Sequence, residues 1–190
     1  MSYKLALFAS GSGSNAENII NYFSGSSKVE CPIIVSNKAD AFVHQRARKL
    51  GIPSFSFTAA EFRSGEAILH LLEEYKIDFI VLAGFLLKVS APLLAAYPDK
   101  IINIHPALLP NYGGKGMYGH FVHEAVVAAG ETESGITIHY VNEHYDEGAI
   151  IYQARCMVEP GDTPEMVAQK VHQLEYEHFP RVIESVVTKD

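Results

Sequence analysis

The sequence predicts a doubly wound, Rossmann-like α/β fold, in which a mostly parallel sheet has helices on both faces and antiparallel strands added near its C-terminal end. Short apolar runs alternate with stretches of helical periodicity through residues 1–104, and this alternation is typical of a parallel sheet. The first apolar run leads directly into a glycine turn that opens a helix, as in phosphate-binding α/β domains. Two later strand-like runs are joined by a polar loop, which predicts an antiparallel pair.

The first half of the chain supplies five expected strands and four expected helices. The strands are short apolar runs, typical of strands that are covered on both faces, at 4–9, 31–35, 54–57, 78–83 and 100–104. Apolar residues at helical spacing predict the helices between them, at 16–22, 40–50, 66–75 and 91–97.

The second half has a different pattern. Residues 106–119 hold four glycines and two prolines, so we expect no long regular element there. A helix at 121–129, strands at 137–141 and 149–158, and a last helix from Thr163 towards Val187 are expected to follow. No internal repeat or linker interrupts the chain, and we expect one domain over 1–190.

Composition excludes several classes of function. The net charge of −7 argues against a nucleic-acid or membrane partner, because such surfaces need clustered Lys and Arg. The first apolar run is too short for a signal peptide, and no stretch reaches the length of a membrane span. Cys31 and Cys156 lie in strand-like runs, and we expect two buried thiols. We therefore expect a soluble, cytoplasmic protein.

The glycine turn has the pattern G-x-G-x-x-A at Gly11, Gly13 and Ala16. Backbone N–H groups at such a helix start can bind an anion, which leaves a dinucleotide, a phosphate ester or an unliganded turn open. A dinucleotide site usually has an acidic residue about 20 positions further on. The second strand is instead followed by Ser-Asn-Lys at 36–38, so a monophosphate is favoured.

Asn103 and His105 lie at the end of a buried strand, where ligands collect in open α/β sheets. Strand alternation places both side chains on the same side, so an amide donor and an imidazole can face one ligand. Asp146 lies in the later polar loop, and from its residue type alone we expect a solvated turn residue.

Other polar residues are weaker candidates. His120 and His123 lack the companion ligands of a metal site, and we expect no metal. Lys115, in the glycine-rich loop, could meet an anion, and Glu175 on the last helix needs no special role.

Together these segments resemble the formyltransferases that use 10-formyltetrahydrofolate, in the right order along almost the whole chain. The motifs are GSGSN at 11–15, SNKADA at 36–41, LAGF at 82–85, NIHPALLP at 103–110 and the D-x-G turn at 146–148. The first two narrow the resemblance to the branch that acts on glycinamide ribonucleotide. The resemblance implies transfer of a formyl group to the amine of that sugar phosphate, with 10-formyltetrahydrofolate as a consumed cosubstrate and no tightly bound cofactor.

The resemblance also implies roles for individual residues. Asn103, His105 and Asp146 would be catalytic, with His105 acting as an imidazolium whose pKa Asp146 raises. Glu175 would bind the ribose hydroxyls, and the remaining substrate-binding residues would be Gly11, Ser12, Gly13, Ser14, Asn15 and Pro106. The folate would contact Leu86, Leu87, Lys88, Val89, Val141, Asn142, Glu143 and His144. The chain would thus have a phosphate-binding half, 1–104, and a folate-binding and catalytic half, 105–190.

The sequence departs from the family pattern at two places. The loop after Pro110 is a few residues longer than in many relatives, and Leu87 and Lys88 stand where an Arg is frequent. The alternatives are a formyl-folate hydrolase, a methionyl-tRNA formyltransferase or a dinucleotide-binding module. The first two usually carry an additional domain, which we do not expect here, and a homodimer is compatible with the sequence.

Overall fold

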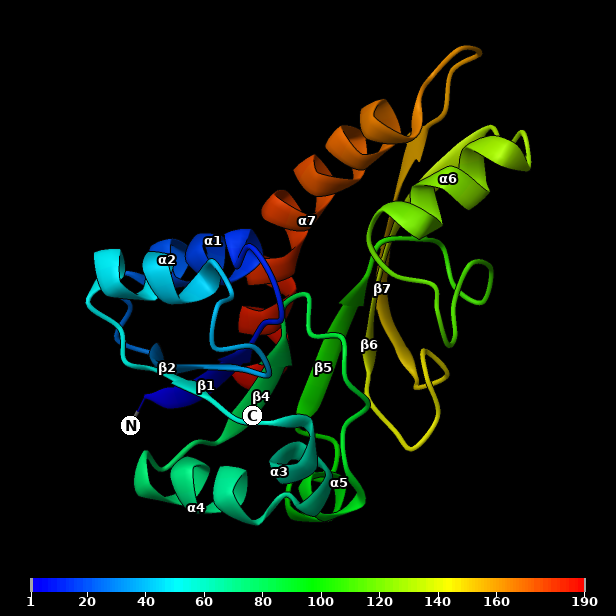
Figure 1. The fold of residues 1–190 in the computed structure, drawn as a ribbon. Coiled ribbons are helices and arrows are strands. Elements are labelled where there is room, and N and C mark those ends of the chain that lie inside the picture. Colours follow the sequence, from blue (N-terminus) through cyan, green and yellow to red (C-terminus); the bar gives the residue numbers. More distant parts are fainter. Residues whose placement is uncertain (1, 190) are drawn as a thin grey trace.

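A seven-stranded sheet in the order β3-β2-β1-β4-β5-β6-β7 forms the centre of the molecule (Figure 1). The structure is a computed structural model and describes residues 2–189. Parallel pairing joins β1 (Tyr3–Phe8), β2 (Val29–Ser36), β3 (Ser54–Ser56), β4 (Phe79–Leu82) and β5 (Ile101–His105). Antiparallel pairing adds β6 (Glu133–Tyr140) and β7 (Ile150–Met157). The predicted fold class is confirmed.

Helices cover both faces of the sheet (Figure 1). One face packs against α1 (Ser14–Phe23), α2 (Val43–Leu50), α6 (His120–Ala128) and α7 (Pro164–Val187). The other face packs against α3 (Ala59–Ser64), α4 (Glu66–Glu74) and α5 (Ala91–Ala96). Along β1, Leu5 and Leu7 enter the first core and Ala6 and Phe8 the second, which explains why the strand reads as a continuous apolar run.

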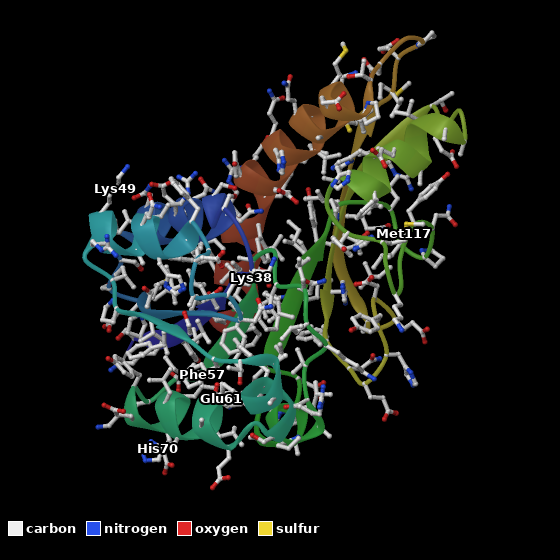
Figure 2. The ribbon with its side chains drawn as sticks, in the orientation of Figure 1. Lys38, Lys49, Phe57, Glu61, His70 and Met117 are labelled. Atoms are coloured by element: carbon white, nitrogen blue, oxygen red, sulfur yellow. The ribbon has the colours of Figure 1, made fainter. Side chains whose placement is uncertain are left out.

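Helix α3 was not predicted from the sequence. Thr58 caps it, because its side chain accepts a hydrogen bond from the Glu61 N–H while the Glu61 carboxylate accepts one from the Thr58 N–H, 2.6 Å away. This reciprocal pair is a capping box, and its Thr-x-x-Glu spacing was readable in the sequence. Figure 2 shows Glu61 in the helical layer on the second face of the sheet.

Two other elements begin three or four residues away from their expected starts. Helix α2 begins at Val43 rather than at residue 40, because 38–41 form a turn in which the Ala41 N–H bonds to the Lys38 carbonyl, 3.2 Å away. Strand β6 begins four residues before the predicted start. It includes Gly135, where a Cβ would lie 2.0 Å from the Ala154 carbonyl oxygen of β7. Gly135 therefore allows β6 and β7 to pair closely, and it does not mark a loop.

Both cysteines are free thiols. Cys31 is buried, as expected, and burial raises its pKa to about 12. Cys156 is only half-buried, which corrects the expectation, because it lies on β7 at the edge of the sheet.

The connections leave a crevice at the carboxyl ends of the central strands. From β1 the chain builds outwards to β2 and β3, and it then returns to place β4 on the other side of β1. The loops after β1 and β4 consequently leave the sheet in opposite directions. The crevice that opens between such loops is the usual ligand-binding position in open α/β sheets. None of the helices in the described part of the chain has the length and apolar character that crossing a bilayer requires.

Candidate active site

A cavity of about 660 Å³ lies in this crevice. The glycine turn after β1, the turn after β4, the end of β5 and the loop before α6 form its walls, and α7 closes one end. It brings together the predicted residues Gly11, Ser12, Gly13, Ser14, Asn15, Leu86, Asn103, His105, Pro106, Asp146 and Glu175.

Seven predicted folate-binding residues lie outside this cavity. Val89 is buried in the second core, Leu87 packs against that core and Lys88 is exposed. The other residues that do not line the cavity are Val141, Asn142, Glu143 and His144. The wall near Leu86 and Asp146 is instead completed by side chains that were not predicted from the sequence, namely Phe85, Met117, Tyr118 and Tyr145, of which Met117 is labelled in Figure 2.

The glycine turn presents the start of α1 to the cavity. Gly13 precedes the helix with φ 72° and has no side chain to cap it. The Ser14 N–H donates to Ser12 Oγ over 3.4 Å, and the next N–H groups remain for a ligand. A Cβ on Gly13 would lie 2.3 Å from Val43 Cγ2. Arg46 of α2 holds the same turn, since its Nε donates to the Ser12 carbonyl over 2.8 Å.

Ser10 ties three loops together beneath the cavity. Its hydroxyl donates to Asn37 Oδ1 over 2.5 Å and accepts the Leu86 N–H over 2.8 Å. The side chain is buried, and it connects the ends of β1, β2 and β4. It thereby sets the position of Leu86 relative to the glycine turn.

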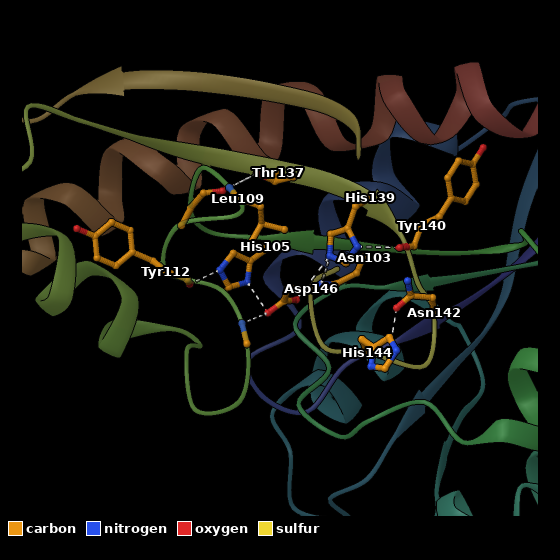
Figure 3. A network of polar contacts seen from close by, with 12 residues as sticks. Asn103, His105, Leu109, Tyr112, Thr137, His139, Tyr140, Asn142, His144 and Asp146 are labelled. Carbon is orange, nitrogen blue, oxygen red and sulfur yellow. Dashed lines mark hydrogen bonds and ion pairs between the residues drawn. The ribbon is translucent and has the colours of Figure 1, made fainter. Parts of the chain in front are cut away.

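The half-buried Asn103 and the buried His139 form a pair on neighbouring strands (Figure 3). His139 Nδ1 lies 2.8 Å from the Tyr140 carbonyl, so Nδ1 carries the proton and Nε2 is an acceptor in the neutral ring. Nε2 accepts from Asn103 Nδ2 over 3.1 Å. The second N–H of the Asn103 amide is then available on the cavity side. His139 was not predicted as a site residue. It lies opposite Asn103, as Thr137 lies opposite His105, and strand alternation places His139 and Thr137 on the same side of β6.

His105 and Asp146 lie at the same end of the cavity (Figure 3). His105 Nε2 donates to the Tyr112 carbonyl over 2.7 Å, and His105 Nδ1 is 3.6 Å from Asp146 Oδ2. Asp146 Oδ2 accepts the Gly114 N–H over 2.9 Å, and Asp146 Oδ1 lies 3.6 Å from His139 Nε2. The carboxylate thus faces both imidazoles.

The electrostatics of this pair differ from the expectation. Burial lowers the pKa of His105 below its ordinary value, and the opposing effects of Asp146 and the Tyr112 carbonyl are smaller. Burial also acts to raise the pKa of Asp146, but its contacts with His139, His105 and the Gly114 N–H together lower it. Burial thus works against the imidazolium that the resemblance implies, whereas Asp146 acts in the expected direction and raises the pKa of His105.

Glu175 lines the same cavity from α7. Its Oε2 accepts from Asn15 Nδ2 over 2.9 Å and from His172 Nδ1 over 2.8 Å, and the hydrogen bond to Glu175 raises the pKa of His172. Within residues 2–189, Asn15 Oδ1 and His123 Nδ1 are buried without a hydrogen-bond partner. In the same range, no group of three His, Cys, Asp or Glu side chains is arranged to hold a metal ion.

Comparison with known proteins identifies related sequences. Residues 3–183 match the family model described as Formyl transferase. Phosphoribosylglycinamide formyltransferase of Bacillus subtilis is 36% identical over 189 residues, covering 97% of this chain and 94% of that relative. The chloroplastic phosphoribosylglycinamide formyltransferase of Arabidopsis thaliana is 41% identical over 189 residues, covering 96% of this chain. This chain spans 65% of the Arabidopsis relative and 13% of a trifunctional purine biosynthetic protein of Drosophila pseudoobscura.

Solved structures have the same fold. Glycinamide ribonucleotide transformylase 1 from Geobacillus kaustophilus superposes with a TM-score of 0.90 at 33% identity, covering 98% of this chain and 100% of that chain. Phosphoribosylglycinamide formyltransferase from Streptococcus pneumoniae superposes with a TM-score of 0.87 at 36% identity, covering 98% of this chain and 99% of that chain.

Proposed function

This chain belongs to the formyl transferase family, and from that premise we propose that it transfers the formyl group of 10-formyltetrahydrofolate to the amine of glycinamide ribonucleotide. One observation carries the proposal. A single cavity is lined both by the start of α1, which no N-cap side chain caps, and by Asn103, His105 and Asp146. A phosphate and a reacting amine of one substrate can therefore be bound in the same cavity.

We propose that the substrate phosphate binds the turn at 11–15, where the N–H groups and the dipole of α1 favour an anion. The ribose would lie along α7. Glu175 Oε2 accepts both hydrogen bonds from Asn15 and His172, which leaves Oε1 for ribose hydroxyls. The glycyl amine would then extend towards His105.

We propose that Asn103 stabilises the tetrahedral intermediate. Attack of the amine on the formyl carbon places negative charge on the formyl oxygen. The Asn103 N–H that His139 does not use can donate to that oxygen, and one such donor is worth about 3 to 4 kcal/mol, or roughly 100- to 1000-fold in rate. By fixing the amide orientation, His139 would hold the donor in place before the reaction.

We propose that His105 takes the proton of the attacking amine at Nδ1, because Nε2 already donates to the Tyr112 carbonyl. Asp146 then stabilises the resulting imidazolium. As the new C–N bond is completed, the bond from the formyl carbon to folate N10 breaks, and the proton passes to N10 through His105 or water. The products are formylated substrate and tetrahydrofolate. A neutral resting imidazole suits this role, since it must accept a proton first.

We propose that the folate enters beside Leu86, Tyr118 and Tyr145, which line the catalytic end of the cavity. Leu87, Lys88 and Val89 would contribute backbone atoms, because their side chains point elsewhere. We propose a phosphate-binding half at 1–104 and a folate-binding and catalytic half at 105–190, to whose site Leu86 and Asn103 contribute from the first half.

The test is production of tetrahydrofolate from 10-formyltetrahydrofolate, with and without glycinamide ribonucleotide, in wild type and in His105→Ala. Turnover that requires the ribonucleotide and is lost in His105→Ala supports the proposal. Turnover without the ribonucleotide would indicate a hydrolase. No turnover, combined with NAD(P) binding in a thermal-shift assay, would indicate a dinucleotide-binding module.

We further propose a cytoplasmic homodimer. The edge strand β7 carries the exposed apolar side chains of Ile150 and Met157, which supports self-association along this edge. Sedimentation of a single monomeric species would refute the dimer.

A further inference from the structure

The segment from Tyr112 to Gly114 contacts both members of the His105–Asp146 pair (Figure 3). The Tyr112 carbonyl accepts the His105 Nε2–H over 2.7 Å, and the Gly114 N–H donates to Asp146 Oδ2 over 2.9 Å. With Nε2 donating, the neutral imidazole keeps its lone pair on Nδ1, the nitrogen 3.6 Å from Asp146 Oδ2. The backbone of this segment therefore determines which nitrogen can take a proton.

The backbone at Tyr112 is held in an unfavourable conformation. Its φ of 55° lies in the left-handed region, which bulky side chains rarely adopt. Such a residue persists only where its surroundings hold it. A return to an ordinary φ would turn the carbonyl away from His105.

The Tyr112 side chain provides a restraint on this conformation. The ring packs partly against the core between the sheet and α6, and Figure 3 shows it directed away from the imidazole. Its hydroxyl donates to Glu131 Oε1 over 2.7 Å. Glu131 is itself fixed at the end of α6, where its N–H bonds to the Val126 carbonyl over 3.2 Å. The hydrogen bond therefore joins the strained turn to the end of a helix.

We infer that Tyr112 and Glu131 are positioning residues for His105. The hydrogen bond between the Tyr112 hydroxyl and Glu131 holds the Tyr112 carbonyl against His105 Nε2, and this keeps His105 Nδ1 as the proton-accepting nitrogen. Neither side chain lines the large cavity, so both act through the backbone of Tyr112. The expected kinetic effects rest on the proposed function. The tautomer assigned to His105 does not, because it follows from the hydrogen bond to the Tyr112 carbonyl.

A pH dependence follows from the groups around His105. Asp146 and Glu175 are its carboxylate neighbours, His139 and His123 are its titratable imidazole neighbours, and the Tyr112 carbonyl also favours the protonated ring. Losing the carbonyl removes a contact that raises the pKa of His105, so that pKa falls further. Since the reaction needs neutral His105, the acid limb of kcat/KM should move to lower pH when the restraint is lost.

The experiment compares Tyr112→Phe and Glu131→Leu with Glu131→Gln, which keeps an acceptor for the hydroxyl. Tyr112→Phe should fold, because Glu131 is exposed beside a second cavity of about 310 Å³ and stays solvated. The matched control is Tyr22→Phe, since the Tyr22 hydroxyl also donates to a glutamate, Glu184 Oε2, 2.9 Å away and outside both cavities.

We expect kcat to fall about tenfold in Tyr112→Phe and Glu131→Leu, less than the roughly 100-fold loss that a 1 Å misplacement of a catalytic group can cause. The KM values should change less than twofold, as should kcat in Glu131→Gln and Tyr22→Phe. Imidazole ¹⁵N chemical shifts of His105 should report the Nε2–H tautomer in wild type and a mixture in the two disrupting variants. Unchanged kcat and tautomer in Tyr112→Phe would overturn the inference. An inactive wild type would refute the proposed function, and the ¹⁵N shifts would still decide the positioning role.

Discussion

Replacing Asp146 by Asn tests whether the carboxylate stabilises the imidazolium formed on His105. The substitution keeps the shape of the side chain and an acceptor for the Gly114 N–H, while it removes the charge and replaces one acceptor oxygen by an amide NH2. Both partners are largely buried, with 4% of the His105 side chain and 12% of the Asp146 side chain exposed. Solvent screening is therefore weaker than at a surface pair.

The size of the effect follows from the separation of the two groups. At 3.6 Å and an effective dielectric constant of about 20, two unit charges attract by about 4 to 5 kcal/mol. The Asn amide recovers part of this through its own dipole. We therefore expect kcat to fall about 100- to 1000-fold, with each tenfold loss corresponding to about 1.4 kcal/mol.

The assay is the initial rate of tetrahydrofolate formation from pH 5 to 9. Asp146 raises the pKa of His105, so Asp146→Asn should also move the acid limb of the profile to lower pH. The matched control is Asp162→Asn, which removes another largely buried carboxylate, ion-paired to Lys170 and outside the cavity. A kcat within fivefold of wild type in a folded Asp146→Asn protein would remove the carboxylate from the mechanism.

Three further substitutions test other parts of the structure. Gly13→Ala places a Cβ 2.3 Å from Val43 Cγ2 at a φ of 72°. We expect the free energy of unfolding in denaturant to fall by at least about 2 kcal/mol and the KM for the ribonucleotide to rise more than tenfold. Wild-type values of both quantities would contradict the role of the glycine turn. Thr58→Ala removes the cap of α3 and should cost about 1 kcal/mol of stability with unchanged kcat, and an equally stable variant would be evidence against the capping box. Glu175 raises the pKa of His172. The pair therefore adds stability below the pKa of about 6.5 that His172 has in the unfolded chain, and this stability is lost as pH rises through the pKa of His172 in the folded protein. His172→Asn should flatten the decline in melting temperature above pH 6.5, and an unchanged slope would exclude the linkage.

The sequence predicted the parts of the site that depend on side-chain type and regular spacing. Continuous apolar runs identified the central parallel strands, and strand alternation alone was enough to place Asn103 and His105 on the same side of their strand. Helix α3 was missed although Thr58 and Glu61 have the spacing of a capping box. The six-residue helix is too short for its apolar period to be visible.

Contacts between distant segments could not be predicted from spacing. Ser10 reaches Asn37 and the Leu86 N–H across two other strand ends, and only the strand order shows that these ends meet. The effect of burial on His105 could not be predicted either. Asp146 raises the pKa of His105, as expected, but the burial that lowers it further than Asp146 raises it depends on how every surrounding segment packs.

Both parts of the proposed site depend on backbone atoms, which any residue type possesses. The proposed anion site uses the N–H groups of α1, and the Tyr112 carbonyl and the Gly114 N–H bond to the proposed catalytic residues His105 and Asp146. These last two contacts occur within four residues of Pro110. The remainder of the glycine-rich loop, up to Gly119, can therefore differ in length from related proteins without moving either contact. Substitutions at Tyr112 should act mainly through its left-handed backbone conformation, whereas those at His105 remove the reacting group itself.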